Sequence, residues 1–251
     1  MGKRRPVWDH QHYLRYLKEG RGQGSGFNYK PWIYIHDFPS RGISTRIMGR
    51  TTGRIHHLLS RNEEYYFYLL DADPTVLDIR EQFPLRLTET MDLARQLNIR
   101  HPWKGSFPFV MTTDFLITKE DGLHARTIKN SEELNNPRVV DKFAIEHAYW
   151  SSKGIDWKIV TENQIDQNLA LNMQWLYAGA SPEQLLHDPV DLLALRNAVL
   201  EMTDEYDRLS PDSITTIEEI FSIAPGSAIA MYKSLILAGD ISPDLHFQLF
   251  F

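Results

Sequence analysis

The stretch VMTTDFLITKEDGLHARTIK, residues 110–129, decides the fold class of this chain. It covers almost the whole of two runs of mainly apolar and β-branched residues, which extend over 109–118 and 124–128. The runs are separated by a segment that contains Lys119-Glu120-Asp121-Gly122. An Asp-Gly pair between two such runs is typical of a hairpin, because both residues tolerate the backbone of the tight turn. The stretch therefore predicts two antiparallel strands that pair directly.

Further strands and helices are expected on both sides of this hairpin. Upstream, the patterns predict strands at 32–36, 46–48, 54–58 and 76–83, and helices at 60–70 and 88–98. Downstream, they predict a helix at 137–153 that ends at Gly154, followed by a strand at 157–161. This order predicts a small mixed sheet flanked by helices, which is an α/β core.

The last third of the chain has a helical pattern. Helices are predicted at 168–177, 181–187, 190–206, 217–223 and 227–238, which places one domain at 1–167 and a second at 168–251. The last two helices, separated by Ala224-Pro225-Gly226, have the spacing of a helix-turn-helix or winged helix. Lys233 is the only basic residue in the second of them, so this domain is expected to bind a protein and not to read DNA.

Composition excludes several classes of protein. The 251 residues are 42% hydrophobic and 24% charged and include no cysteine, which excludes disulfide scaffolds, zinc ribbons, iron–sulfur clusters and thiol nucleophiles. There is no apolar run of bilayer-spanning length, so no membrane partner is expected. The basic start of the chain has no apolar segment behind it, so we expect no signal peptide and a reducing compartment, the cytoplasm.

Charge is distributed unevenly along the chain. Residues 1–61 hold twelve Lys and Arg against three acids, a net charge of +9, whereas residues 181–251 carry −9. A basic segment on an acidic body predicts a polyanion partner at one end, and glycines among the basic residues would allow close backbone approach to it. The alternative is that these side chains only solvate the surface. The candidate DNA contacts are Arg21, Lys30, Arg46, Arg50, Arg54, His56, His57 and Arg61.

Three residues could form the catalytic centre of a metal-dependent phosphodiesterase. Such a centre needs carboxylates for Mg²⁺ and usually a lysine near the attacking water. Glu63 lies in the first turn of the helix that Ser60 begins, Asp114 lies inside an apolar strand, and Lys129 follows the second strand of the hairpin. An acid inside an apolar strand is costly unless it is paired or binds a metal.

Each candidate also has a structural interpretation. Glu63 could complete a capping box with Ser60, and Lys129 could be a solvated strand end. His56 and His57 are adjacent on a strand and face opposite ways, so one is expected to be packed and the other to contact DNA. Glu81 and Glu146 are secondary candidates, and Glu146 could be an ordinary surface acid.

Several ordered blocks resemble the TnsA endonuclease family of TnsABC-type transposons. These blocks are EGRGQG at 19–24, GRIHHLLS at 53–60, VLDIREQFPL at 76–85, MTTDFL at 111–116, YW at 149–150 and WLY at 175–177. The resemblance implies a restriction-endonuclease-like N-terminal domain that nicks the 5′, non-transferred strands at transposon ends. It also implies two partners, a DDE recombinase of TnsB type and an AAA+ ATPase of TnsC type.

The resemblance places the family's catalytic positions on Glu63, Asp114 and Lys129 and a family acid on Glu146, with Mg²⁺, or Mn²⁺ in its place, as cofactor. The metal site would also use Thr127 and Ile128. The family pattern is Gln-x-Lys, whereas this chain has Thr127-Ile128-Lys129, which puts a second metal position in question. The alternative function is an inactive adaptor that links the recombinase to the ATPase.

Overall fold

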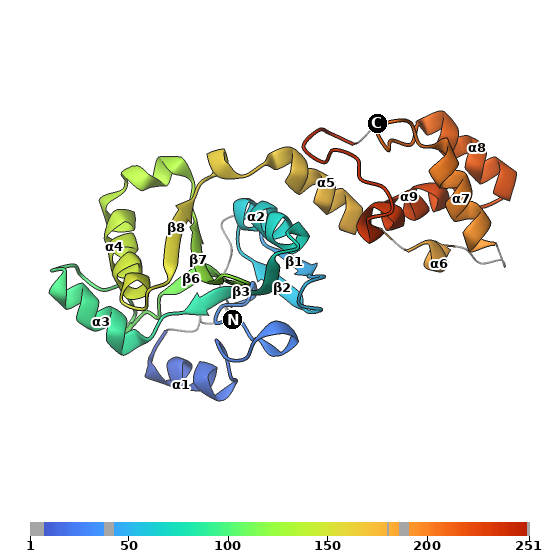
Figure 1. Ribbon diagram of the computed structural model, residues 1–251. Helices are drawn as coiled ribbons and strands as arrows, with labels where there is room; N and C mark the ends of the chain where they lie inside the picture. Colours follow the sequence, from blue (N-terminus) through green and yellow to red (C-terminus); the bar gives the residue numbers. More distant parts are fainter. Residues whose placement is uncertain (1–7, 38–42, 180, 186–190, 250–251) are drawn as a thin grey trace, which may run out of the picture. The chain divides into compact units, whose positions relative to one another are not determined.

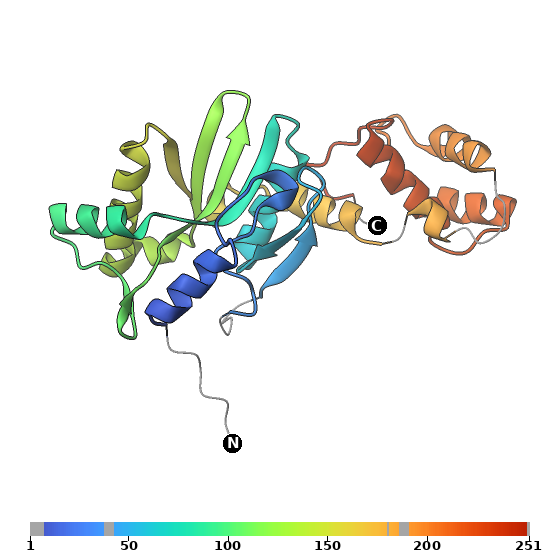
Figure 2. The ribbon, with the colours of Figure 1, turned by 90° about the horizontal axis from the view of Figure 1, so that it is seen from below.

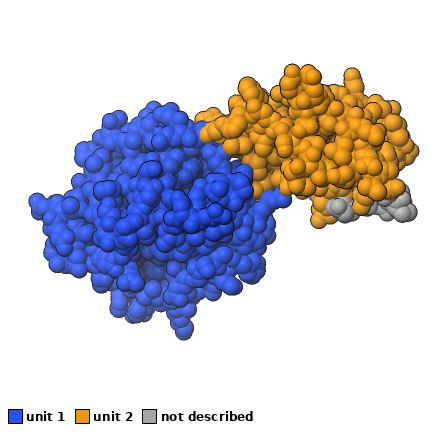
Figure 3. All heavy atoms as spheres, in the orientation of Figure 1, with its two compact units in different colours: residues 1–165 blue, residues 166–251 orange. Residues whose placement is uncertain are grey.

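The computed structural model describes residues 8–37, 43–179, 181–185 and 191–249. The chain divides into two compact units, Met1–Ile165 and Asp166–Phe251, two residues before the expected boundary (Figure 3). None of the helices in the described ranges is both long and apolar enough to cross a bilayer.

Unit 1 is built on a mixed four-stranded sheet, which confirms the expected α/β core (Figure 1). The strand order is β3-β6-β7-β8, with β3 antiparallel to β6, β6 antiparallel to β7 and β7 parallel to β8. The strands are β3 (Val76–Pro84), β6 (Thr112–Lys119), β7 (Gly122–Ile128) and β8 (Asp156–Val160). The Asp121-Gly122 hairpin therefore forms the centre of the sheet, as predicted.

Helices cover both faces of this sheet (Figure 2). On one face lie α3 (Leu87–Gln96) and α4 (Pro137–Ser151), whose apolar side chains share a core with Leu116 and Ala125 of the central strands. On the other face lies α2 (Arg61–Ala72), where the Tyr66 ring packs against the Phe115 ring at 5.8 Å between centroids. Neighbouring residues of β6 thus point into different helix layers.

Small elements complete unit 1. They are α1 (His10–Lys18), η1 (Gly26–Asn28), β1 (Thr45–Met48), β2 (Ile55–Leu58), β4 (Trp103–Lys104), β5 (Phe107–Pro108), η2 (Ser131–Asn135) and η3 (Glu162–Gln164). The β1-β2 hairpin was predicted, whereas α1, β4 and β5 were not.

The predicted strand at 32–36 is wrong. Residues 32–37 form bends and a turn, in which the Asp37 carboxylate accepts from the Tyr34 N–H. Trp32 and Ile33 are consecutive residues that are both buried in a cluster with Tyr16 of α1, which the alternating faces of a strand would not allow. Burial of these rings follows from tertiary packing and not from strand pairing.

The glycine-rich segment before this turn packs closely against other residues of the same chain. Gly22 has φ +73°, and a Cβ there would lie 2.2 Å from the Pro84 side chain at the end of β3. Gly24 has φ +88°, and a Cβ there would lie 2.6 Å from the Asn28 carbonyl oxygen. Gly22 and Gly24 are therefore explained by chain packing, and the expected approach to a ligand is not needed to account for these two.

Unit 2 is helical in its described part. Its helices are α5 (Gln167–Tyr177), α6 (Pro182–Leu185), α7 (Leu192–Met202), α8 (Pro211–Phe221) and α9 (Ser227–Ala238). Helix α8 begins six residues earlier than predicted, because Ser210 caps it and Pro211 occupies its first turn. The β pairing in the described part of this unit is one isolated bridge, Thr203↔Leu209, so a winged-helix form stays a prediction.

The one basic residue of α9 has an internal role. The Lys233 ammonium donates to the carbonyl oxygens of Trp175 and Ala178, at 2.7 and 3.0 Å, and lies over the Trp175 ring. It thereby satisfies the C-terminal end of α5. The expectation that this helix does not read DNA stays a prediction.

Candidate active site

Glu63 and Asp114 come together between α2 and the sheet. Ser60 caps α2 by accepting from the Glu63 N–H at 3.2 Å, which places Glu63 in the first turn. The Glu63 carboxylate then accepts from the Leu59 N–H and the Ser60 hydroxyl, both at 2.9 Å. Ser60 therefore caps α2 as predicted, although the Glu63 carboxylate accepts from the Leu59 N–H in place of the Ser60 N–H. A role of Glu63 in a metal site stays a prediction.

Asp114 lies where the central strands separate. The last regular pair between β6 and β7 is Phe115↔Arg126, and beyond it the Ile128 N–H donates to Asp114 Oδ2 at 2.8 Å. Phe115 faces α2, whereas Thr113 bonds to α4, so the alternation of β6 is broken at Asp114. This irregularity turns the carboxylate toward Glu63 and brings the Ile128 peptide beside it.

A residue that the sequence analysis did not select joins the two carboxylates. Gln82 of β3 donates through Nε2 to Asp114 Oδ1 at 3.1 Å and to Glu63 Oε2 at 3.3 Å. Its Oε1 accepts from the Thr112 hydroxyl at 3.1 Å. The signal available in the sequence was the polar pair Glu81-Gln82 near the end of an alternating strand. In the structure both of these consecutive residues are buried.

Glu63 and Asp114 are two acids whose negative charges are not offset by a neighbouring basic side chain in the described part of the chain. Burial, and then the charge of Asp114, raise the pKa of Glu63 to about 8. Burial also raises the pKa of Asp114 to about 6, although the Ile128 N–H, Gln82 and the Lys129 charge act in the opposite direction. Within the described residues, neither carboxylate has a basic side chain within ion-pair distance.

Lys129 lies near the pair but has another partner. Its ammonium forms an ion pair with Glu133 of η2 at 2.8 Å, while its charge still lowers the pKa of Asp114. Asn62 of α2 donates to the Asn130 side chain at 2.7 Å, which ties the first turn of α2 to the segment that follows Lys129. The three predicted catalytic residues thus lie in one region of unit 1.

Thr127 and Glu146 lie on the opposite face of the sheet, which corrects the prediction for both. Glu146 of α4 is 3% exposed, and its Oε1 accepts from the hydroxyls of Thr127 and Thr113, both at 2.6 Å. The Thr127 hydroxyl also accepts from Trp157 Nε1 at 3.1 Å, so it points away from Asp114. Burial raises the pKa of Glu146 to about 7. Glu146 is therefore neither a surface acid nor a partner of Glu63.

Glu81, although adjacent to Gln82, belongs to a different cluster. Its carboxylate accepts from both terminal nitrogens of Arg54 and from His56 Nδ1, the last at 2.8 Å. His56 is fully buried and also contacts the Thr52 hydroxyl at 2.7 Å. Of the two adjacent histidines, His56 is thus the packed one, while His57 is half-buried, which lowers its pKa.

The predicted DNA contacts divide into buried and exposed side chains. Arg21 and Arg54 are each 6% exposed, and Arg21 bonds to Glu19 and Asp37, so the prediction of DNA contact is wrong for these two and for His56. Their charges serve buried ion pairs in place of phosphates. The exposed members of the set are Lys30, Arg46, Arg50 and Arg61.

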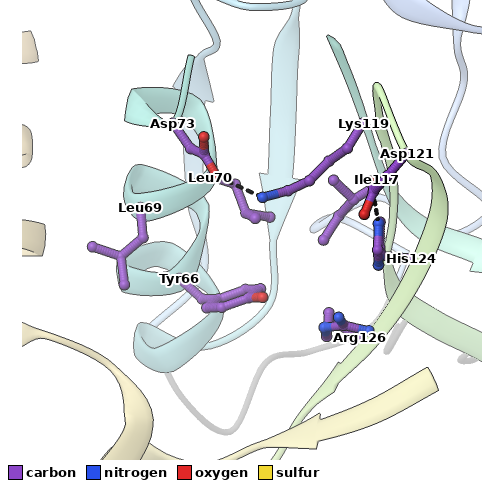
Figure 4. Close-up of a pocket in the computed structure, with 9 residues that line it drawn as sticks. All are labelled: Tyr66, Leu69, Leu70, Asp73, Ile117, Lys119, Asp121, His124 and Arg126. Atoms are coloured by element: carbon purple, nitrogen blue, oxygen red, sulfur yellow. Dashed lines mark hydrogen bonds and ion pairs between the residues drawn. The ribbon is translucent and has the colours of Figure 1, made fainter. Parts of the chain in front are cut away.

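A hollow lies on the α2 face of the sheet, at the far end of β6 from Asp114 (Figure 4). Its volume is about 310 Å³, and its lining includes Lys119, His124 and Arg126. Each of these is paired with an acid: Lys119 with Asp73 at 2.6 Å, His124 with Asp121 at 2.9 Å and Arg126 with Asp156 at 2.7 Å. Because Lys119 and Arg126 are ion-paired with acids, the hollow is a weaker candidate than the carboxylate pair.

Comparison with known proteins identifies the family. A family model described as the TnsA-like endonuclease N-terminal domain matches residues 73–162. The transposon Tn7 transposition protein TnsA of Escherichia coli is 38% identical over 208 residues, which cover 82% of this chain and 76% of that protein. The chain belongs to the TnsA family. This TnsA-family chain is thereby placed among the endonucleases of transposition, and the matched domain includes Gln82, Asp114 and Lys129.

The donor set suits a hard divalent cation. Mg²⁺ is usually held by one or two carboxylates together with waters and substrate phosphates, and not by a cage of protein ligands. In the described part of this TnsA-family chain no group of three or more His, Cys, Asp or Glu side chains could hold a metal. Two buried carboxylates without a cationic partner are the kind of oxygen donors that magnesium or manganese takes.

Proposed function

We propose that this chain is a Mg²⁺-dependent DNA endonuclease that nicks the 5′, non-transferred strands at transposon ends during cut-and-paste transposition. It would act with a DDE recombinase of TnsB type, which cuts the other strand, and an AAA+ ATPase of TnsC type. The observation that supports this most directly is the pair Glu63 and Asp114, buried, joined through one neutral amide and lacking a basic partner within the described residues.

The chemistry assigned to the residues is hydrolysis of a phosphodiester. Bound Mg²⁺, or Mn²⁺ in its place, would neutralise phosphate charge and lower the pKa of the attacking water. Glu63 and Asp114 would hold the metal, with the Ile128 peptide beside Asp114. Lys129 would leave Glu133 and orient the water whose oxygen forms the new bond to phosphorus, while the bond from phosphorus to O3′ breaks. The products are a 3′-OH and a 5′-phosphate.

The exposed basic residues would hold the DNA backbone. Lys30, Arg46, Arg50 and Arg61 belong to residues 1–61, the segment that holds twelve Lys and Arg against three acids. Contacts of this kind add affinity without reading sequence. We therefore expect the recombinase to supply the specificity for transposon ends. The purified chain alone should not cut bare transposon ends at specific positions.

The test is cleavage of an end-labelled donor with the recombinase and ATPase present, in Mg²⁺, with the wild type compared with Asp114→Ala. The wild type should cut the 5′ strands, whereas the variant should leave only the recombinase nicks at the 3′ strands. Identical products from both proteins would assign Asp114 to structure and favour the adaptor function. A sequence-specific cut by the wild-type chain alone would overturn the division of labour.

A further inference from the structure

Gln82 has a backbone conformation that is unusual for its residue type. Its φ is +48°, although it lies inside β3 between the regular pairs Glu81↔Phe115 and Phe83↔Thr113. A non-glycine residue in this region costs about 1–3 kcal/mol and persists only where the surroundings impose it. The residue between the two pairs on the partner strand is Asp114. The distortion of β3 therefore lies directly opposite the distortion of β6.

The consequence of this distortion is the position of one carboxamide. Gln82 is 2% exposed, and its amide fills the place between Glu63 and Asp114. Its Nε2 faces the two carboxylates, and its Oε1 faces Thr112. The strained backbone of Gln82 thus holds its carboxamide in place, with the N–H donors on one side and the oxygen acceptor on the other.

The present orientation suits two carboxylates alone but not a cation between them. A cation beside Glu63 and Asp114 would meet the positive end of the Nε2 amide dipole. A half-turn of the carboxamide removes this conflict, because it directs Oε1 toward the carboxylates and Nε2 toward Thr112. The Thr112 hydroxyl can accept as well as donate, so it can bond to the carboxamide in both orientations.

We propose that Gln82 is a ligand of the metal held by Glu63 and Asp114, through its amide oxygen after the carboxamide has turned over. Thr112 then changes from donor to acceptor. This inference rests on the proposed function, because it concerns the same site. It assigns to Gln82 two roles: it holds the carboxylates together before the metal arrives, and it completes the oxygen donors afterwards.

The test measures Mn²⁺ binding to the full chain, by the electron paramagnetic resonance signal of free Mn²⁺, without DNA or cleavage. Gln82→Met keeps much of the side-chain volume but has no oxygen, and Gln82→Glu keeps an oxygen but has no N–H. Both are non-glycine residues, so both carry the same backbone strain as the wild type. The matched control is Gln164→Met, because the Gln164 amide caps η3 and bonds to Thr161, not to Glu63 or Asp114.

The expected result is that Gln82→Met weakens Mn²⁺ binding about tenfold or more, while Gln82→Glu binds at least as tightly as the wild type and Gln164→Met is unchanged. Equal or tighter binding by Gln82→Met would overturn the proposal, because it would make the amide only a scaffold that competes with the metal. If Gln82→Met does not fold in a thermal unfolding assay with EDTA, Gln82→Ala decides the same question. Failure of the wild type itself to bind Mn²⁺ would refute the proposed function instead.

Discussion

Glu81 and Gln82 are neighbours on β3, yet they belong to two buried acid clusters with opposite electrostatics. In the first cluster, Arg54 and His56 surround Glu81 and outweigh the effect of burial, so the pKa of Glu81 is lowered to about 2. In the second, Gln82 supplies only a neutral amide to Glu63 and Asp114, and burial raises both of their pKa values.

The difference distinguishes a structural acid from a binding acid. A buried charge is stable when its partner comes from the same chain, as for Glu81. A pair of carboxylates that lacks such a partner favours protonation or an external cation. Four predictions test this distinction, in order of decreasing expected effect.

The largest effect is expected from Asp114→Asn. Cleavage of the 5′ strand should fall roughly 10³-fold or more, because loss of a metal-holding carboxylate removes several kcal/mol of transition-state stabilisation. The free energy of unfolding in EDTA should stay equal or rise, since one member of a repelling pair is gone. Asp121→Asn, at the exposed hairpin turn, is the control and should cleave normally. Wild-type cleavage by the Asp114 variant would contradict the prediction.

The next effect is expected from Glu81→Gln, which should act on stability and not on chemistry. Removing one partner of a buried ion pair leaves Arg54 and His56 uncompensated and should lower the free energy of unfolding by about 3–5 kcal/mol. Urea denaturation measures this loss. The control Glu89→Gln breaks only exposed ion pairs, with Arg86 and Lys153, and should cost less than about 1 kcal/mol. Equal losses in both variants would remove the distinction between the clusters.

The third prediction concerns pH, where the two clusters act in opposite directions. Glu63 and Asp114 have folded-state pKa values of about 8 and 6, above the ordinary 4.5 and 3.8, so the folded chain binds more protons than the unfolded chain between these limits. Their contribution to stability therefore falls as pH rises from about 4 to 8, and Glu146, at about 7, has the same sign. Glu81, at about 2, stabilises fully above 4.5 and loses this effect as pH falls toward 2.

Chemical unfolding in EDTA across pH 4–8 measures the first of these trends. Asp114→Asn should show a shallower decline than the wild type, because one titrating group is removed and Glu63 loses its like-charged neighbour. Mg²⁺ should raise stability most near pH 8, where both carboxylates can be deprotonated. A wild-type stability that rises over this range would refute the sign of the argument.

The smallest effects are expected for surface arginines. Arg46→Ala should weaken DNA binding a few-fold and reduce the salt dependence by about one counterion, with an unchanged melting temperature. Arg54→Ala should lower the melting temperature, because it breaks the ion pair with Glu81. Fluorescence anisotropy over a salt series and thermal unfolding separate the two outcomes. An unchanged salt slope for Arg46→Ala would remove it from the DNA surface.

Local patterns predicted much of unit 1 because the relevant interactions are short in range. Asp121-Gly122 specified the central hairpin, the alternation at 76–83 specified β3, and Ser60 specified the start of α2. Helix α1 was missed because its stability comes from packing of the Tyr16 ring against Trp8 and Trp32. Both tryptophans lie outside the helix, so the sequence pattern of the helix itself does not contain them. The wrongly predicted strand at 32–36 begins in the same aromatic cluster.

The candidate site was predictable in its acids but not in its geometry. Asp114 was selected because an acid within an apolar strand is costly unless it is paired or binds a metal. Glu63 was selected because it lies in the first turn of the helix that Ser60 begins and because the family resemblance places a catalytic position there. Which face each strand residue occupies could not be predicted, since the irregularity at Asp114 breaks the alternation on which such an inference depends. For that reason Thr127 and Glu146 were assigned to the site although they lie on the other face.

The sequence by itself determined the α/β class, the central hairpin, the family and the pair of carboxylates, because each depends on residue types at close or ordered spacing. Only the tertiary structure decided which charges are paired. It buried Arg54 against Glu81, turned Thr127 to Glu146 and placed Gln82 between Glu63 and Asp114. These pairings join residues 19 to 32 positions apart, and their energies depend on burial and on distances of about 3 Å, which no local pattern contains.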